Sequence, residues 1–371
     1  MKGRAVRMGG FDPGTARRIA MTVSCPDADE IPKVADAGAC RDQVGGRVQI
    51  MHNGLVVGEG GYYGEWMTET IRALRGHHEP QEELVFDRIV DRLRSGADAP
   101  VMIEFGSFWT YYGLWFCHAL PSSRVVALEP DAPYLEIGRR NAALNGFTDR
   151  ITFFHAAIGR EPGRVFAFRA ESDGLLHDVV QHDLPSLMLA ADLERVDLVL
   201  CDAQGAETVL LERAKDYLRD GRVRFLIVST HHHSISGNAL THQNALALLM
   251  ESGAHVISEH TVAESFSGDG LIAVSFDARD KDFVVPVSYA RSKDSLFGEV
   301  EVDLAAASAR GIEAEQGRIE AEARLTQLRT ELADLESDRD ALRAHLDAIT
   351  GTKLGRWAKG SRTVYGRIRG S

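Results

Sequence analysis

Three acidic side chains lie at the ends of strand-like segments, and they are the residues of this sequence best placed to bind a ligand. Glu104, Glu129 and Asp202 each close an apolar run, and Gly106 follows the first of them. In an open parallel sheet, ligands bind beyond the carboxyl ends of the strands, at the point where the strand order reverses. We therefore expect Glu104 and Asp202 to face each other across that point, with Glu129 on the neighbouring strand.

The segment after Gly106 decides between classes of ligand. A dinucleotide site needs several glycines, so that backbone N–H groups can approach a pyrophosphate, but mostly bulky residues occupy positions 107–112 before the next glycine. A cofactor with an amino group, a cationic centre and a ribose, but no phosphate, fits an acidic strand end better. S-adenosylmethionine is such a molecule, and Glu129 is placed to accept hydrogen bonds from both ribose hydroxyls.

Methyl transfer to a hydroxyl also calls for a general base, because a poorly acidic hydroxyl must lose its proton as the bond forms. Asp202 is the first candidate, and the run of three histidines that ends the next strand offers His231 and His233. A metal bound by these two with His242, and a polar loop without a catalytic part, are the alternatives. Neighbours in an extended segment point to opposite faces, so three successive histidines rarely bind one ion, and we predict no metal.

Apolar, β-rich runs alternate with helical stretches from residue 101 onward, which predicts a mostly parallel sheet covered on both faces. The seven predicted strands are Val101–Phe105, Arg124–Glu129, Ile151–His155, Val196–Asp202, Arg224–Thr230, His255–Glu259 and Leu271–Phe276. Helices are expected from the cap Asp131 to Asn145, over Ala206–Leu218 and over Thr241–Ser252. The last two strands lack a helix between them and are expected to form an antiparallel hairpin at one edge. This α/β outline is that of a Rossmann-like class I methyltransferase sheet.

Four motifs in this sheet resemble the FkbM-type methyltransferases, over about residues 79–276. They are Ile103-Glu104-Phe105-Gly106-Ser107, Leu128-Glu129-Pro130-Asp131, Asn141-Ala142-Ala143-Leu144-Asn145-Gly146 and Cys201-Asp202-Ala203-Gln204-Gly205-Ala206-Glu207. The family pattern reads acid-x-Gly-Ala-Asn-x-Gly, Glu-Pro, Asn-x-x-x-Asn and Asp-x-Glu-Gly-x-Glu. This chain departs from it at Ser107, Phe108 and Thr110 in the first loop and at Gln204.

The resemblance implies S-adenosylmethionine-dependent O-methylation of sugars or other hydroxylated metabolites. It implies that Glu104, Gly106 and Ser107 lie along the methionine part of the cofactor, and that Glu129 and Pro130 lie at the ribose. Ala157 is expected to border the adenine.

Residues 1–78 are expected to form an N-terminal extension before a methyltransferase domain over residues 79–290. Apolar runs on both sides of Asn53-Gly54 predict a β-hairpin in the extension. Tyr62 and Tyr63 follow among glycines. We favour packing at the edge of a small subdomain for these aromatic residues, and a ligand site is the alternative.

The boundary between the extension and the domain contains two histidines. His77 and His78 precede a helix that opens at Glu79 with Pro80 in its first turn. We interpret the histidine pair as a solvated turn.

Residues 300–350 carry a heptad pattern, which predicts a coiled coil. The apolar positions alternate at spacings of three and four, with Arg339 in the one polar seam position, and they are Leu325, Leu328, Leu332, Leu335, Leu342, Leu346 and Ile349. We expect this helix to make the chain a homo-oligomer. A single amphipathic helix folded back on the domain is the alternative.

Charge is spread unevenly over the 371 residues. The chain has a net charge of −12, yet the basic tail over residues 351–371 holds six lysines and arginines and no acid, so the remainder carries −18 (36 basic residues against 54 acidic). The tail also contains Trp357 and Tyr365, a composition that suits contact with a membrane surface. A disordered, solubilising end is the alternative.

Composition narrows the remaining classes of function. An acidic chain is a poor candidate for binding nucleic acid through its overall field, and no apolar run reaches the roughly 18 residues of a membrane span. The N-terminus lacks the apolar core of a secretory signal, and the four cysteines show no metal-ligand spacing. We therefore expect a cytoplasmic protein, with peripheral contact at the inner membrane through the tail.

Together these features predict an S-adenosylmethionine-dependent O-methyltransferase. We expect its acceptor to be a hydroxyl of a glycan or related small molecule, in bacterial surface polysaccharide biosynthesis. A non-catalytic scaffold with the methyltransferase fold, assembled through the coiled coil, is the first alternative. A nicotinamide-dependent oxidoreductase is the second, and the loop at positions 107–112 argues against it.

Overall fold

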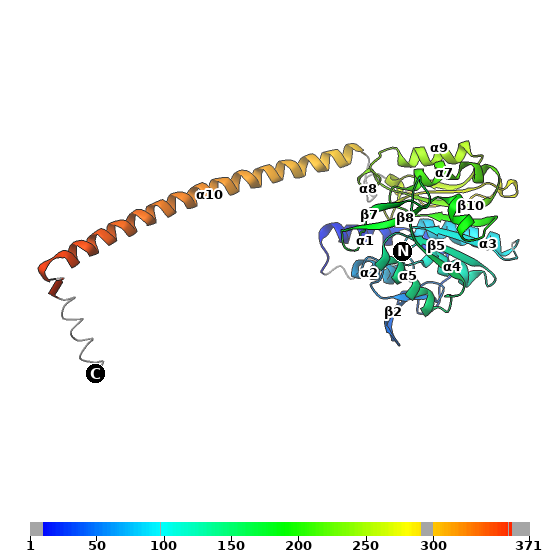
Figure 1. Ribbon diagram of the computed structural model, residues 1–371, viewed down its shortest axis with the longest axis horizontal. Coiled ribbons are helices and arrows are strands. Elements are labelled where there is room, and N and C mark those ends of the chain that lie inside the picture. The colour runs from blue at the N-terminus through cyan, green and yellow to red at the C-terminus, as the bar shows by residue number, and fades with distance from the viewer. Residues whose placement is uncertain (1–9, 97, 291–299, 355, 358–371) are drawn as a thin grey trace. The chain divides into compact units, whose positions relative to one another are not determined.

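The computed structural model describes residues 10–96, 98–290, 300–354 and 356–357. The chain divides into two compact units, one up to Val302 and one after it. The first unit holds a large sheet between two layers of helices, and Figure 1 shows its elements in chain order. The strands of this sheet are β4 (Val101–Phe105), β5 (Arg124–Glu129), β6 (Ile151–Ile158), β7 (Val165–Arg169), β8 (Leu176–His182), β9 (Val196–Cys201), β10 (Val223–Thr230), β11 (His255–His260) and β12 (Gly270–Ser275).

The strand order is β11-β12-β10-β9-β4-β5-β6-β8-β7, and it reverses direction at β4. The six strands in the middle of this order, from β10 to β8, are parallel to one another. Strand β12 is antiparallel both to β10 and to β11, so the expected edge hairpin is confirmed. The fold class is therefore the expected α/β sheet, mostly parallel.

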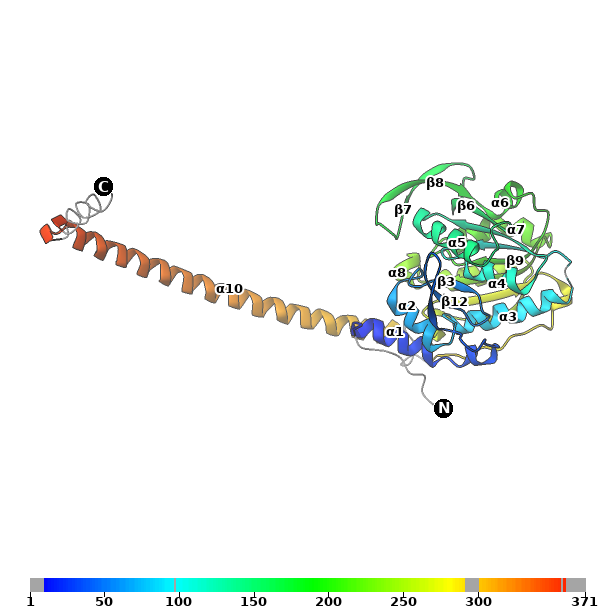
Figure 2. The same ribbon diagram turned by 90° about the horizontal axis from the view of Figure 1, so that it is seen from below.

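The predicted count of seven strands is wrong, because the sheet has nine strands in the described residues. The two additional strands, β7 and β8, pair antiparallel with each other at the outer edge, where Figure 2 shows them curving away from the centre of the sheet. Most of their side chains are exposed or only half-buried. An edge hairpin that buries so little lacks the continuous apolar run by which the other strands were predicted.

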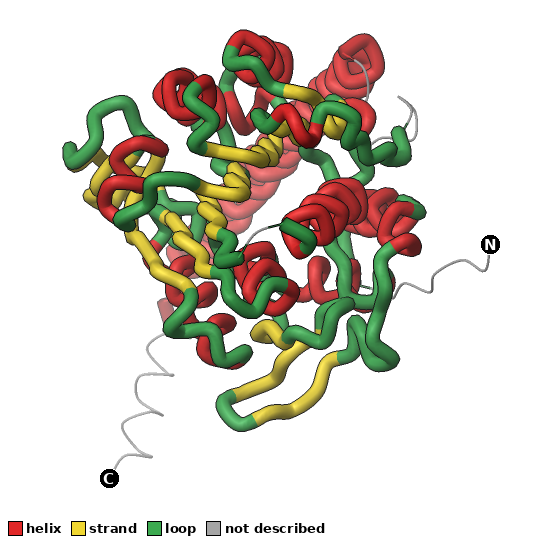
Figure 3. Tube along the Cα trace, turned by 90° about the vertical axis from the view of Figure 1, so that its right-hand side faces the viewer, coloured by secondary structure: helices red, strands yellow, loops and turns green. Residues whose placement is uncertain are grey.

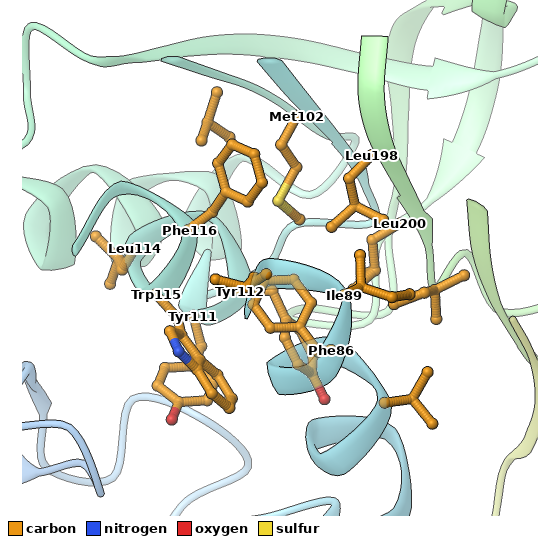
Figure 4. Close-up of a cluster of buried hydrophobic side chains, with 14 of the residues drawn as sticks. Phe86, Ile89, Met102, Tyr111, Tyr112, Leu114, Trp115, Phe116, Leu198 and Leu200 are labelled. Carbon is orange, nitrogen blue, oxygen red and sulfur yellow. The ribbon is translucent and has the colours of Figure 1, made fainter. Parts of the chain in front are cut away.

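Helices cover both faces of the sheet, as Figure 3 shows. One face carries α3 (Pro80–Arg94), α4 (Tyr111–Ala119) and α5 (Ala132–Leu144), and the other carries α6 (Leu184–Ala190), α7 (Glu207–Arg219) and α9 (Thr241–Glu251). Figure 4 shows the first core, where Phe86 and Ile89 of α3 pack towards Met102 of β4 and Leu200 of β9. The strands are continuously apolar because both of their faces are buried.

The N-terminal segment packs on this domain. Its elements are α1 (Pro13–Ser24), the 3-10 turn η1 (Asp27–Glu30), β1 (Cys40–Gln43), β2 (Gly46–Ile50), β3 (Val56–Gly58) and α2 (Glu65–Ala73). Strands β2 and β3 pair antiparallel, so the predicted hairpin around Asn53-Gly54 is confirmed, and β1 adds a third strand.

Two asparagines of α5 tie the N-terminal sheet to the domain. The Asn141 side chain accepts a hydrogen bond from the Gly58 backbone at 3.0 Å, and Asn145 accepts one from the Val56 backbone at 3.0 Å. The Asn-x-x-x-Asn motif therefore holds β3 against α5, because positions four apart lie on one face of a helix.

The second unit consists mainly of one long helix. Helix α10 (Val300–Gly351) has 52 residues, and the described leucines and isoleucines of its heptad stripe are exposed in the single chain. A helix is thus confirmed here, whereas its coiled-coil partner stays a prediction. Among the described residues, no helix combines the length and the apolar composition needed to cross a bilayer. The tail beyond Trp357 lies outside the described residues.

Candidate active site

A cavity of about 510 Å³ opens at the carboxyl ends of β4, β5 and β9. Such a volume is in the range of small-molecule sites. Every residue predicted to bind the cofactor lines it, namely Glu104, Gly106, Ser107, Glu129, Pro130, Ala157 and Asp202. Glu104 and Asp202 thus meet at the point where the strand order reverses, as the sequence predicts.

Gly106 allows the ends of β4 and β9 to meet so closely. Its φ of +75° is in the region that favours glycine. A Cβ atom at this position would lie 1.7 Å from the carbonyl oxygen of Asp202. No other residue fits there without moving the strand that carries Asp202.

The side of the cavity formed by β4 and β5 holds two buried carboxyl groups that face no cationic side chain in the contacts described. Glu104 Oε2 accepts a hydrogen bond from the Gly113 N–H at 3.2 Å. The two oxygens of Glu129 accept one each from the N–H groups of Phe108 and Asp131, both at 2.9 Å. Burial raises the pKa of Glu104 well above its usual range and that of Glu129 to about 7. A cationic ligand would stabilise the ionised form of both groups.

The loop after Gly106 forms a wall of the cavity. Phe108 and Thr110 adopt positive φ angles of 37° and 61° without being glycines, a backbone conformation that costs free energy and is tolerated where the surroundings fix it. The Phe108 ring stacks on Tyr134 with 3.6 Å between ring centroids. The bulky residues at positions 107–112 therefore shape the site, and the loop offers no glycine-rich cradle for phosphate.

Asp202 is held by a buried histidine. His231 Nε2 lies 3.1 Å from Asp202 Oδ1, and its Nδ1 lies 2.7 Å from Glu207 Oε1; Asp269 is also near, at 3.7 Å. Burial lowers the pKa of His231, but these carboxylates outweigh it and bring the pKa well above the usual range. The carboxylates therefore favour the protonated imidazole of His231, which in that form positions Asp202 instead of accepting a proton.

The other two histidines of the run lie elsewhere. His232 caps the short helix α8 (His233–Ser236), and the exposed side chain of His233 is not among those that line the cavity. His242 binds Thr230 and Glu259, each at 2.7 Å. His233 is therefore not at the predicted catalytic position, because the chain leaves the extended conformation where α8 begins at His233.

Two interpretations of the N-terminal residues are corrected. Tyr62 and Tyr63 line the cavity, so the ligand-site alternative describes them better than packing at an edge. His77 and His78 are 0% and 1% exposed, and His78 lines the cavity, so they are not a solvated turn. A signal was present in the sequence, since the paired histidines stand directly before the helix α3, whose N-cap Glu79 lines the cavity.

Asp131 was expected to cap the helix α5. It occupies the N-cap position, but its side chain does not cap the helix. Its carboxylate accepts hydrogen bonds from the backbone N–H and hydroxyl of Ser172, at 2.9 and 2.7 Å. Asp131 thereby fixes the turn between β7 and β8. Phe166 and Phe168 of β7 also line the cavity.

The described residues contain one buried cluster of three potential metal ligands, His52, His77 and Glu83. The two imidazoles stack with 16° between their planes, so the lone pairs in those planes do not converge on a common point. His52 Nδ1 pairs with the Tyr111 hydroxyl at 2.8 Å, and His77 Nδ1 pairs with Glu83. These contacts make the cluster a hydrogen-bond network, and we assign it no metal.

Parts of this chain are similar to known proteins. No protein-family model matches the chain. A segment of 123 residues is 32% identical to the release factor glutamine methyltransferase of Chlorobaculum tepidum, and it covers 32% of this chain and 40% of that protein. The chain thus spans less than half the length of this curated relative.

Solved methyltransferase structures are similar to the chain at low identity. A putative O-methyltransferase from Klebsiella pneumoniae is 20% identical over 52% of this chain and 79% of that chain, with a TM-score of 0.34. An O-methyltransferase from Bacillus cereus in complex with SAH is 17% identical over 52% and 80%, with a TM-score of 0.34. The strand order, with its reversal at β4, is that of a Rossmann-like α/β fold.

Proposed function

We propose that this chain is an S-adenosylmethionine-dependent methyltransferase that methylates a hydroxyl of a glycan or related metabolite. The observation that carries the proposal is the charge of the cavity. Two basic residues line it, Arg169 and His78. The acidic lining residues outnumber them and are Glu79, Glu104, Glu129, Asp131, Glu171 and Asp202. Such a lining suits a cationic sulfonium donor and opposes a pyrophosphate.

The residues present fit this donor, which supplies an activated methyl group when it is bound. Glu104 and Glu129 are buried carboxyl groups that a cation would stabilise, and Gly106 keeps the backbone close. By the resemblance to FkbM-type enzymes, Glu104, Gly106 and Ser107 would hold the methionine part. Glu129 with Pro130 would hold the ribose, and Ala157 would border the adenine.

Asp202 is the residue we assign to the proton of the acceptor. It lines the cavity, whereas His231 reaches the cavity only through it. As the new bond between the acceptor oxygen and the methyl carbon forms and the bond from that carbon to sulfur breaks, the hydroxyl proton passes to the Asp202 carboxylate. The protonated His231 keeps that carboxylate oriented, so positioning supplies much of the rate.

Calorimetric titration of the full chain with S-adenosylmethionine tests the proposal. We expect binding to the wild type and at least tenfold weaker binding to Glu104→Gln, because the substitution removes an anionic partner of the cation. Glu161→Gln, an exposed glutamate, is the matched control. A wild-type chain that does not bind the donor would refute the assignment.

The heptad stripe of α10 supports a second proposal, that the chain is a homo-oligomer through this helix. Leu332 and Leu335 lie in the stripe and are exposed in the single chain, and burying them against a second copy would remove apolar surface from water. Sedimentation of Leu335→Asp, with the neighbouring Ala333→Asp as control, tests it, and an unchanged mass would contradict it. Attachment of the basic tail to a membrane surface, near the site of surface polysaccharide assembly, also stays a proposal.

The scaffold alternative makes a different prediction. A chain that binds the donor and assembles through α10, but transfers no methyl group to any glycan extract, would favour a non-catalytic role. Mass spectrometry of surface glycans from cells with the wild type or with Asp202→Ala separates the two. We expect a methyl group to be lost from one sugar in the variant.

A further inference from the structure

We propose that Glu79 is a second carboxylate that contacts the methyl acceptor, and that His78 and Glu83 position it. The inference rests on the proposed function, because it assumes that the cavity holds an acceptor beside the donor. It concerns residues at the start of α3, outside the strand ends at which the sequence motifs lie.

His78 lies between two carboxylates, as His231 does. His78 Nδ1 lies 2.6 Å from Glu83 Oε1, a buried glutamate in the first turns of α3. Its Nε2 lies 3.4 Å from Glu79 Oε2, and Glu79 lines the cavity. His231 likewise has a buried helix glutamate on Nδ1 and a cavity-lining carboxylate on Nε2. Two glutamate–histidine–carboxylate arrays, from distant parts of the sequence, therefore end at one cavity.

Glu83 is held rigidly in the array of Glu83, His78 and Glu79. One of its oxygens accepts the backbone N–H groups of His78 and Glu79, at 2.8 and 3.2 Å, and the other pairs with His77. Burial opposes ionisation of Glu83, but the two imidazoles lower its pKa well below the usual range. Burial also lowers the pKa of His78, and Glu79 with Glu83 reverses this and brings it to about 10.

Aromatic rings fix the orientation of the His78 imidazole. The rings of Tyr62 and Trp109 meet it edge-on, with centroids 5.4 and 4.9 Å away, and these two rings stack on each other at 4.4 Å. Tyr111 and Tyr112 pack around it at 5.3 and 5.8 Å. Besides these rings, the charged groups near His78 are the carboxylates of its own array and the buried Glu82, whose pKa His78 acts to lower while burial raises it.

A buried ion pair is weak evidence for stability, because desolvation offsets the attraction between the charges. We therefore interpret the protonated imidazole between two carboxylates as positioning one of them, Glu79, to bind a ligand in the cavity. Glu79 also accepts a hydrogen bond from the Tyr112 hydroxyl at 3.4 Å, so its position is defined from two sides. We assign it a hydrogen bond from the acceptor, which orients the reacting hydroxyl towards Asp202 and the methyl group.

The test uses the full chain, methyl-labelled S-adenosylmethionine and a panel of methyl glycosides as acceptors. We expect the wild type to label at least one glycoside. Glu79→Gln should lower kcat/KM for that glycoside by roughly 10–10²-fold, the loss of a hydrogen bond to a charged group, with the dissociation constant of the donor changed less than about twofold. Glu161→Gln, on the exposed surface, should behave as the wild type does.

His78 acts through Glu79, so its test needs a readout other than turnover. In NMR spectra, the His78 imidazole should stay protonated through pH 8 in the wild type and should lose its proton at lower pH in Glu79→Gln. His78→Gln should raise the KM for the glycoside and lower kcat by a smaller factor than Glu79→Gln does.

Three outcomes would overturn the assignment: wild-type turnover in Glu79→Gln, a His78 pKa that does not change in that variant, or a wild type that binds the donor and labels none of the glycosides. A wild type that fails to bind the donor would instead refute the proposed function itself. Donor calorimetry on each variant thus separates the two failures.

Discussion

The two sides of the cavity neutralise their acidic groups in different ways. On the side of β4 and β5, Glu104 and Glu129 accept only backbone N–H groups in the contacts described, and burial raises the pKa of both. On the opposite side, Asp202 and Glu79 each lie against a histidine that neighbouring carboxylates keep protonated. In the described contacts, Glu104 and Glu129 have no cationic partner, whereas Asp202 and Glu79 each have an imidazolium beside them.

This difference indicates what each side can bind. Buried carboxyl groups without a cation gain most from a ligand that brings a positive charge, as a sulfonium donor does. Carboxylates that already face an imidazolium have part of their charge balanced, and they can accept hydrogen bonds from a neutral hydroxyl. An ammonium acceptor held between carboxylates would keep its proton and would be a poor nucleophile. The contrast therefore favours a hydroxyl acceptor.

Removing the Asp202 carboxylate should have the largest effect on turnover. We expect Asp202→Asn to lower methyl transfer by roughly 10²–10⁴-fold, because the amide cannot accept the acceptor's proton, while the donor still binds. Rates with labelled donor and calorimetry with the donor measure the two effects. Asp178→Asn, at an exposed position on β8, is the control. Equal rates in both variants would show that Asp202 does not accept the proton and would contradict the assignment of its side of the cavity to the acceptor.

Breaking the Glu83 network should reduce stability strongly. Glu83→Ala leaves His77 and His78 without their shared partner and two backbone N–H groups without an acceptor. We expect a loss of about 3–5 kcal/mol in the free energy of unfolding, measured by urea denaturation. The exposed control Glu161→Ala should stay within about 0.5 kcal/mol of the wild type. A loss no larger than that of the control would show that the array carries no buried charge.

The buried carboxyl groups on the side of β4 and β5 should make donor binding depend on pH. The pKa of Glu129 is about 7 in the free protein, and a bound cation lowers it, so binding releases protons near and below pH 7. We expect donor affinity to fall as the pH drops below 7, by up to about tenfold per pH unit. Calorimetry in buffers of different ionisation enthalpy counts the protons. Glu129→Gln should flatten this dependence, and an unchanged slope would assign it to another group.

The smallest effect concerns the orientation of Glu79. Tyr112→Phe removes the hydroxyl that hydrogen-bonds to Glu79 Oε2 and leaves the ring packing in place. We expect a two- to tenfold loss in kcat/KM for the glycoside, which corresponds to about 0.5–1.5 kcal/mol for one hydrogen bond. A loss as large as that of Glu79→Gln would mean that Tyr112 contacts the acceptor directly.

Local patterns were sufficient to predict the centre of the fold. Each of the seven predicted strands is present, and the helices after Asp131, Ala206 and Leu240 begin within one residue of the expected positions. Continuous apolar runs report burial on both faces of a strand, and this burial is what makes a strand central. The same patterns placed Glu104, Glu129 and Asp202 at the cavity, because parallel strands end at a common edge.

The half of the site formed by the N-terminal segment and α3 was mispredicted for a physical reason. A histidine pair before a helix has the same local sequence whether it is solvated or buried, and only the packing of α3 against α4 and the N-terminal segment encloses His78. Its partner Glu83 lies nearby in sequence, but the rings around it come from Tyr62 and Trp109, which are separated from each other along the chain. Protonation depends on that enclosure, since burial and nearby carboxylates together set the pKa.

The sequence by itself determined the sheet, the strand-end carboxyl groups and the long C-terminal helix, because these depend on the period and extent of apolar residues. Tertiary structure alone decided which side chains share the cavity and which of them are charged. It turned His233 outward, placed His231 behind Asp202 and brought Glu79 into the same cavity. Electrostatic interactions fall off with distance and depend on the surrounding medium, so the chemistry of these groups is fixed only when the chain has folded around them.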